Sequence, residues 1–390
     1  MIVCNIGRAL WFCLLCVASV ALVPKSTEHI TRAGIYYLLD DRLEYVHNYS
    51  RCDLLQDALN RFAERLDQVS TDLGYENDKV KELSSLTKMQ IHINSGCDES
   101  AQLLWPTEFM REEYVVDVSH GVINIVAEQI WGILHALETV QQLIFLNRFR
   151  MRIIQSQLIL DEPRFAHRGY LIDTSRHYLQ TELILNFLDA MSMVKMNVLH
   201  WHIVDDTSFP YYSHTFPNLT LKGAYHPFAY IYTREDVLRV IQHARSRGIR
   251  VMSEFDTPGH TQCWGLGHPE LLTQCFDNHG NPTNELGPID PTRNSSYEFM
   301  EQLMNEVKQT FPDNFVHLGG DEVDFSCCCW YLNYIQYGND WIAQYNCDPT
   351  EFGGSIDFTG TPEEISRVLG GEAAMWGEYV DDTNIFSRSW

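Results

Sequence analysis

Two adjacent carboxylates, Asp321 and Glu322, are the residues of this 390-residue chain best suited to chemistry. They follow a hydrophobic stretch and two glycines in the run "NFVHLGGDEV", so we expect them at the end of a strand. An acid held there can give and take a proton in general acid–base catalysis, which contributes about 10²–10⁴-fold to a rate. The charge of Asp321 would raise the pKa of Glu322 and keep that acid protonated.

Ionisable residues also end the other apolar stretches of this part of the chain. "RGYLIDTSR", "MNVLHWHIVDD" and "IRVMSEFDTPGH" have the pattern of buried strands, and amphipathic helices separate them. Alternating buried strands and helices predict an α/β fold with a parallel sheet. Polar residues at the carboxyl ends of the strands favour a (β/α)8 TIM barrel, which carries its active site there. A doubly wound sheet is the alternative, but no glycine-rich phosphate loop follows the first strand. The strand-end residues are Asp173, Asp205, Asp206, Glu254, Asp256, His260, Asp321 and Glu322.

The preceding part, residues 22–160, has the pattern of a small N-terminal α/β domain. "SRCDLLQDALNRFAERLDQV" places leucines and a phenylalanine on one helical face, and "KMQIHIN" alternates like a strand. "EYVVDV" and "GVINIV" predict a hairpin turning at Ser119–Gly121, and a helix follows in "AEQIWGILHALETVQQLIFL". Proline in "DEPR" marks a boundary, so we expect the catalytic domain to occupy residues 161–390.

The first 21 residues resemble a signal peptide. Arg8 precedes a run of fourteen apolar residues that ends near Ser19-Val20-Ala21, which suits signal peptidase. A membrane anchor is the alternative, but a bilayer span needs about 20 apolar residues. No later segment is apolar enough to span a membrane, and the net charge of −24 argues against nucleic acid as a partner. We expect the secretory pathway, with a lysosomal or extracellular destination. Three glycosylation sequons agree with that route: Asn48, Asn218 and Asn294.

Of the 11 cysteines, three lie in the expected signal peptide and eight remain. In an oxidising compartment they predict disulfides, and a zinc site is the minor alternative. The run Cys327-Cys328-Cys329 lacks the C-x2-C spacing of a zinc knuckle. We therefore expect no metal.

Five segments, in this order, resemble the family 20 glycoside hydrolases, and most closely the animal lysosomal β-N-acetylhexosaminidase subunits. They are "PRFAHRGYLIDTSRHYL", "MNVLHWHIVDDTSFPY", "IRVMSEFDTPGHT", "HLGGDEVDF" and "LGGEAAMWGEYVDDTN". The resemblance implies hydrolysis of terminal non-reducing N-acetyl-D-hexosamine residues, with glycans or glycoconjugates as substrates, no cofactor and a possible homodimer. A family 18 chitinase is the less favoured alternative, since its D-x-x-D-x-D-x-E run is missing.

The chemistry implied by this resemblance suits two neighbouring carboxylates. Glycosidases usually place one carboxyl group on each side of the sugar, which residues adjacent in sequence cannot do; family 20 is a recognised exception. There the 2-acetamido oxygen of the substrate attacks C1 as the glycosidic bond breaks, and water then attacks C1 from the other face, so the two inversions give retention. Glu322 would protonate the leaving oxygen and later activate water. Asp321 would hold the acetamido N–H, and Tyr331 would bind the acetamido oxygen.

By the same resemblance, five further residues take supporting roles. Arg168 would grip sugar hydroxyls with its planar guanidinium. Trp376 and Glu378 would provide a pocket wall and a hydroxyl acceptor. Asp205 and His260 would support the acid.

Three more expectations concern a second wall and the disulfides. Trp264, beside a glycine in a loop, is a candidate for another pocket wall. The resemblance pairs Cys52 with Cys97 and Cys275 with Cys327. It leaves Cys263, Cys328, Cys329 and Cys347 without a predicted partner.

The run between Phe325 and Trp330 is too short for this family. Only Ser326 and three cysteines lie there, and four residues span at most about 14 Å. A crossover between parallel strands needs a dozen residues or more. We therefore expect an internal deletion near Cys328 that removes strands five, six and most of seven, and relatives also continue beyond residue 390. The alternative function is a catalytically impaired or misfolded variant, at most a carbohydrate-binding protein, because a barrel that lacks strands has open edges.

Overall fold

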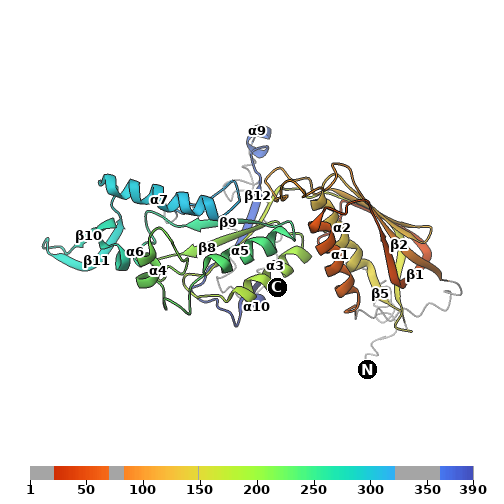
Figure 1. Ribbon diagram of the computed structural model, residues 1–390, viewed down its shortest axis with the longest axis horizontal. Coiled ribbons are helices and arrows are strands. Elements are labelled where there is room, and N and C mark those ends of the chain that lie inside the picture. The colour runs from red at the N-terminus through yellow and green to blue at the C-terminus, as the bar shows by residue number, and fades with distance from the viewer. Residues whose placement is uncertain (1–21, 70–82, 148, 321–360, 390) are drawn as a thin grey trace, which may run out of the picture. The chain divides into compact units, whose positions relative to one another are not determined.

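The computed structural model describes residues 22–69, 83–147, 149–320 and 361–389 (Figure 1). These divide into two compact units. The first comprises the described residues of Met1–Gln102 and Arg111–Pro163, and the second those of Leu103–Met110 and Arg164–Trp390. Among the helices of these ranges, none is both long and apolar enough to cross a membrane.

The first unit contains a six-stranded sheet in the order β1-β2-β4-β3-β6-β5, with two helices packed side by side against it (Figure 1). β1 also pairs with β6. The elements are β1 (Glu28–Val46), α1 (Asp53–Leu66), β2 (Ser84–Ile93), β3 (Tyr114–Ser119), β4 (Val122–Ala127), α2 (Ile130–Leu143), β5 (Ile144–Leu146) and β6 (Arg152–Asp161).

Local patterns account for most of this unit. The expected face of α1 is buried, and β3 and β4 form the expected hairpin. Its two turn residues, His120 and Gly121, have φ values of 51° and 74°, as a two-residue hairpin turn requires. The long strand β1 and the strand β6 are not among the expected elements, and β5 forms where the helical pattern was expected to continue.

The second unit is built on a parallel sheet in the order β12-β7-β8-β9. A parallel bridge between Glu254 and His317 extends it beyond β9. The helices α3, α5 and α7 follow β7, β8 and β9 in turn. The sheet strands and main helices are β7 (His167–Asp173), α3 (Thr181–Met193), β8 (Val198–Val204), α4 (Pro217–Gly223), α5 (Arg234–Arg245), β9 (Arg250–Phe255), α7 (Asn294–Thr310) and β12 (Gly370–Met375). The shorter elements are α6 (Trp264–Gly267), η1 (Pro269–Leu271), β10 (Leu272–Phe276), β11 (Pro282–Ile289), α9 (Pro362–Ile365) and α10 (Ile385–Ser389).

The pairing of β12 with β7 identifies the barrel type. Six consecutive residues of β12 pair in parallel with β7, although about 200 residues separate the two strands in the chain. In a (β/α)8 barrel the last strand returns beside the first, and the intervening strands follow in sequence order. The prediction of an α/β fold of TIM-barrel type after a small α/β domain is therefore confirmed. The described residues supply four strands and the bridge at His317, which is an incomplete barrel.

The strand β8 shows how the sequence places polar groups inside this unit. All seven of its residues are buried. Leu199, Trp201 and Ile203 belong to the hydrophobic core that also contains the α3 and α5 faces. Because side chains alternate along a strand, His200 and His202 face the other side of the sheet. There they meet carboxylates of neighbouring strands.

Candidate active site

The carboxyl ends of the parallel strands gather the ionisable residues that the sequence pattern placed there. Arg176 lies three residues beyond β7, Asp205 directly follows β8, and His260 lies in the loop after β9. Trp376 directly follows β12. These four side chains are linked by the contacts described next, so they define one candidate site.

Asp205 and His260 are in contact, as the resemblance implies. Asp205 is 1% exposed, and its Oδ1 lies 3.3 Å from His260 Nδ1. Its Oδ2 lies 2.7 Å from His202 Nε2 and 3.0 Å from Arg176 Nη2. Burial alone would raise the pKa of Asp205, but hydrogen bonds from His202 and His260 and nearby positive charges hold it well below its usual range. Asp205 is therefore an ionised group that orients both imidazoles.

His260 has a left-handed backbone conformation, with φ of 54°. A residue with a β-carbon held in such a region costs about 1–3 kcal/mol, which the surrounding structure must supply. Strain of this kind concentrates at functional sites. The conformation and the contact with Asp205 together make His260 the strongest described candidate for supporting the acid.

The arginine at this site is Arg176, and the prediction for Arg168 is wrong. Arg168 is the second residue of β7, at the opposite end of the strand. Its Nη1 donates to the Phe165 carbonyl at 2.7 Å and its Nε to the Lys195 carbonyl at 2.9 Å. A side chain bound to main chain at the amino end cannot grip a sugar at the carboxyl end. Both arginines lie in the motif "RGYLIDTSR", and only their positions relative to the strand's end distinguish them.

Arg176 is held in place by two carboxylates and an aromatic ring. Its Nη1 lies 2.9 Å from Asp173 Oδ2, and its Nη2 contacts Asp205. Its guanidinium carbon lies 5.3 Å from the centre of the Trp376 ring. Trp376 is half-buried, and its ring meets that of His202 edge-on at 4.8 Å. Arg176 and Trp376 are thus in contact at the candidate site, and the role of Trp376 as a pocket wall stays a prediction.

Trp264 does not form a second wall, so that prediction is corrected. Its side chain is fully buried, and its ring packs against Phe209 and Phe299 with centroid distances of 5.3 and 6.5 Å. The short helix α6 turns this indole into the hydrophobic core. Glu378, by contrast, is exposed two residues beyond Trp376, and its role as a hydroxyl acceptor stays a prediction.

Asp256 shapes the backbone that leads to the predicted catalytic pair. Its Oδ1 accepts a hydrogen bond from the Gly320 N–H at 3.1 Å. Gly319 has φ of 70°, and a β-carbon added there would lie 1.6 Å from the same oxygen, so only glycine fits. Burial and the charge of Glu254 raise the pKa of Asp256 to about 6. The two residues that follow, Asp321 and Glu322, lie outside the described residues, and so does Tyr331.

A cluster of three described side chains at this site has ligand atoms close enough together to hold a metal ion. His202, Asp205 and Asp256 bring one ligand atom each within 4.8 Å of one another. However, His202 Nε2 and Asp205 Oδ2 are hydrogen-bonded to each other. We assign no metal to this group.

The disulfide between Cys52 and Cys97 is present, which confirms that prediction. Cys275 carries a free thiol among the described residues. Its expected partner, Cys327, lies outside them, as does the expected join near Cys328, so both stay predictions. The three sequon asparagines, Asn48, Asn218 and Asn294, are exposed.

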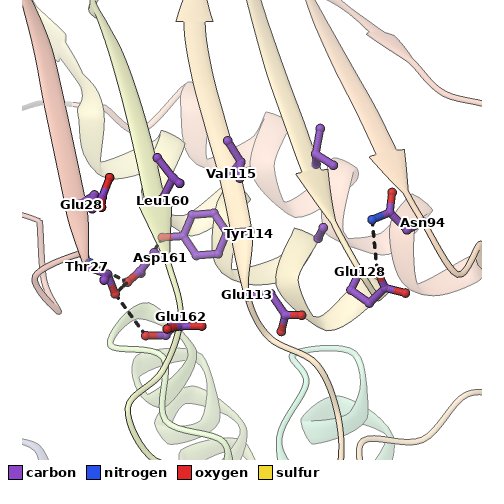
Figure 2. Close-up of a pocket in the computed structure, with 12 residues that line it drawn as sticks. Thr27, Glu28, Asn94, Glu113, Tyr114, Val115, Glu128, Leu160, Asp161 and Glu162 are labelled. Atoms are coloured by element: carbon purple, nitrogen blue, oxygen red, sulfur yellow. Dashed lines mark hydrogen bonds between the residues drawn. The ribbon is translucent and has the colours of Figure 1, made fainter.

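A cavity of about 410 Å³ lies in the first unit, at one end of strands β3, β4 and β6 (Figure 2). Tyr114 donates to Asp161 at 2.8 Å, and Asn94 donates to Glu128 at 3.1 Å. None of the predicted site residues that the structure describes lines this cavity. Its lining includes five carboxylates: Glu28, Glu113, Glu128, Asp161 and Glu162.

The comparisons with known proteins agree with this geometry. Residues 165–347 match the catalytic domain of glycosyl hydrolase family 20, and residues 22–143 match a domain described as β-acetyl hexosaminidase like. The β-hexosaminidase subunit beta of Felis catus is 37% identical over 96% of this chain and 85% of its own length. The chain belongs to glycosyl hydrolase family 20.

Other family members extend the comparison. The β-hexosaminidase subunit alpha of Bos taurus is 35% identical over 87% of this chain and 79% of its own length. Among solved structures, a chitobiase of Flavobacterium johnsoniae shares the fold with a TM-score of 0.75 and 22% identity, over 95% of this chain and 67% of that one. An exo-β-N-acetylglucosaminidase of Vibrio harveyi has a TM-score of 0.60, with 77% of this chain covering 47% of that one.

The family relatives carry residues that this chain lacks. The feline alignment runs over 467 positions, whereas 96% of 390 residues is about 374, so about 93 positions (467 less 374) are filled by the relative alone. The bovine alignment leaves about 90 such positions (429 less 339). A shortfall of this size is that of two or three β/α units. It agrees with the expected deletion, although its place near Cys328 stays a prediction.

Proposed function

We propose that this protein is a β-N-acetylhexosaminidase that hydrolyses terminal non-reducing N-acetylglucosamine or N-acetylgalactosamine residues of glycans and glycoconjugates. The observation that carries this proposal is the 37% identity to a β-hexosaminidase subunit along 96% of the chain. The strand-end site described above supports it, because its ionised and aromatic groups are those that bind and cleave a sugar.

In the proposed mechanism, the acetamido oxygen of the substrate attacks C1 while Glu322 protonates the leaving oxygen. Asp321 holds the acetamido N–H and stabilises the positive intermediate, and Tyr331 binds the acetamido oxygen. Glu322 then removes a proton from the water that attacks C1 and opens the intermediate, and this second inversion at C1 restores the original configuration. Asp205 and His260 support the acid, and Asp256 fixes the Gly320 N–H just before the catalytic pair.

We further propose that Arg176 binds the sugar hydroxyls against the face of Trp376. The two carboxylates that hold Arg176 leave its planar guanidinium in one orientation, which favours bidentate hydrogen bonds to neighbouring hydroxyls. Replacement by lysine would keep the charge and lose that geometry. We expect Arg176→Lys to raise KM by at least about tenfold, since a buried hydrogen bond to a charged group is worth about 1.5–3 kcal/mol.

The test of the activity is turnover of a chromogenic N-acetylglucosaminide by the 390-residue chain, at about pH 4.5, where an acid of raised pKa stays protonated. Glu322→Gln should abolish turnover, and Glu182→Gln, an exposed carboxylate change, should not alter it. The matching glucoside, which has a hydroxyl in place of the acetamido group, should not be cleaved. Equal cleavage of both glycosides would contradict the substrate-assisted mechanism.

A second candidate is a catalytically impaired variant that at most binds sugars. The roughly 93 positions missing against the feline relative favour it, because a barrel positions its catalytic groups only when closed. A misplacement of about 1 Å can cost about 10²-fold in rate. A folded parent chain with no turnover of either glycoside would select this candidate.

The cellular route and the assembly are also proposals. The Cys52–Cys97 disulfide and the exposed sequons support passage through the secretory pathway to the lysosome or the cell exterior. A homodimer follows from family resemblance alone. Cleavage by an endoglycosidase, and the mass of the native protein in solution, test the two statements.

A further inference from the structure

Two histidines of β8 and three carboxylates form a continuous array behind the candidate site, and all of them except the half-buried Glu372 are buried. His200 lies between Glu372 of β12 and Glu254 of β9: its Nδ1 is 2.6 Å from Glu372 Oε1 and its Nε2 is 2.7 Å from Glu254 Oε2. His202 continues the array, with Nδ1 2.8 Å from the same Glu254 oxygen and Nε2 2.7 Å from Asp205 Oδ2. Asp205 then contacts His260.

Burial makes the protonation of these groups consequential. His200, His202 and Glu254 are each at most 2% exposed, and Asp205 is 1% exposed. Water cannot compensate a mismatched pair at such depth, so each contact must join a donor to an acceptor.

Counting donors gives the charge of the two imidazoles once the carboxylates are known to be ionised. Burial alone would raise the pKa of Glu254, Glu372 and Asp205, but hydrogen bonds from the histidines hold it below the usual range. A neutral imidazole carries one N–H and one lone pair, whereas an imidazolium carries two N–H groups. Both nitrogens of His200 and both of His202 lie within 2.6–2.8 Å of carboxylate oxygens, which accept when ionised. A neutral ring would set a lone pair against a carboxylate in one of its contacts. Two cations alternating with three anions satisfy all four contacts.

Glu254 is the centre of this arrangement. One of its oxygens serves both histidines, and the other accepts from His317 Nδ1 at 2.9 Å. Its removal would leave His200 and His202 without their shared anion. The proposed mechanism gives Glu254 no step, yet it lies two contacts from Asp205, through His202, and three from His260.

We propose that Glu254 is a positioning residue: by holding His200 and His202 as cations, it keeps Asp205 ionised and oriented toward His260. The statement rests on the proposed function for its catalytic consequence. Its structural part, the charge of the two imidazoles, stands independently of turnover.

Other charged groups face the array from every neighbouring element. His167 of β7 lies 3.1 Å from Glu372, and Arg176 pairs with the same Asp205 oxygen that His202 contacts. Burial favours the neutral imidazoles, but the hydrogen bonds and charges of the carboxylates raise the pKa of His200 to about 9 and that of His202 to about 10. The titratable and charged groups around the array are His167, Asp173, Arg176, Asp206, Asp256, His260 and His317.

The first test uses the unaltered protein. Nitrogen-15 NMR of histidine-labelled chain, assigned with single His→Gln variants, reports which ring nitrogens carry protons between about pH 5 and 8, the range in which an ordinary histidine titrates. We expect both nitrogens of His200 and of His202 to stay protonated across it. A single N–H on either ring at neutral pH would overturn the proposal. This measurement needs no enzymatic activity.

The second test is Glu254→Gln, with Glu182→Gln as the matched control. In the first variant, His200 or His202 should lose a proton within the same pH range. Where His202 loses it, the His260 signal should shift, because Asp205 then keeps Arg176 as a cationic neighbour but loses His202. The acidic limb of the kcat/KM profile should move to higher pH and kcat should fall at least about tenfold, with KM changed less. The control should leave all these readouts at the parent values.

Each combination of results is informative. If Glu254→Gln does not fold, Glu372→Gln replaces it: this half-buried partner touches His200 and not His202, so only His200 should lose its charge. A parent without turnover defeats the proposed function while the NMR result still decides the charge of the array. Normal turnover with an unmoved pH profile in Glu254→Gln would refute the positioning role and leave the function standing.

Discussion

Substitution of Trp264 tests whether this residue belongs to the hydrophobic core or to the candidate site. Its indole is fully buried against Phe209 and Phe299. A tryptophan buries about 150–250 Å², and at about 25 cal/mol per Å² this corresponds to roughly 4–6 kcal/mol. Truncation of such a side chain to alanine costs about 3–5 kcal/mol once the cavity is included. We therefore expect Trp264→Ala to lower the free energy of unfolding by about 3–5 kcal/mol.

A conservative substitution sharpens this expectation. The Trp264 Nε1 is buried without a hydrogen-bond partner among the described residues, so removal of the N–H carries no lost bond. Trp264→Phe keeps most of the packing and should cost less than about 1.5 kcal/mol. Trp376→Ala is the matched contrast, since this half-buried ring should affect sugar binding more than stability.

Urea unfolding followed by circular dichroism measures these differences, because the free energy of unfolding falls linearly with urea. Binding of N-acetylglucosamine to the same variants provides the second readout. A core position for Trp264 is contradicted if the free energy of unfolding of Trp264→Ala lies within about 1 kcal/mol of the parent value while sugar affinity drops. That result would show that Trp264 contacts the sugar and is not a core residue.

Three further predictions concern stability. Burial lowers the pKa of His200, but hydrogen bonds with Glu254 and Glu372 raise it to about 9. Protonated His200 therefore stabilises the fold fully below the unfolded pKa of about 6.5. As pH rises to about 9, the free energy of unfolding should fall by about 3 kcal/mol. Equal urea midpoints at pH 6 and pH 9 would contradict this. The double variant Cys52→Ser, Cys97→Ser opens a loop of 45 residues and leaves a capping hydroxyl before α1. It should lower the free energy of unfolding by about 4 kcal/mol. An unchanged urea midpoint would show that the disulfide does not stabilise the fold. Gly169→Ala places a β-carbon 2.6 Å from Glu372 Oε2 and should lower the free energy of unfolding by about 1–3 kcal/mol. An unchanged Tm would show that the Glu372 side chain moves aside without cost.

Local chemistry made several elements predictable. α5 begins with a capping box between Thr233 and Asp236, a local pattern whose two partners lie within one helical turn. The buried face of α1 follows from helical period alone. By contrast, β1 is long, carries both faces partly exposed and joins two different partners, so no single period marks it.

Pairings between distant segments were less accessible from the sequence. The motif "RGYLIDTSR" contains two arginines, and spacing alone does not say at which end of the strand each guanidinium points. Trp264 stands beside glycine in a loop, a setting that suits a pocket wall as well as a core residue. Burial decides between them, and burial depends on α7 supplying Phe299 from the other side.

By itself, the sequence determined the alternation of buried strands and helices in the second unit and the acidic pair, because these depend on short-range pattern. The five ordered motifs gave the family resemblance, and that resemblance gave the Cys52–Cys97 link. Only the tertiary structure decided that Arg176 rather than Arg168 faces the site and that Trp264 is core. It also decided that His200, His202 and Glu254 form one charged array. The physical reason is that burial and charge pairing arise between strands distant in the chain, and a side chain's role depends on which neighbours exclude water from it.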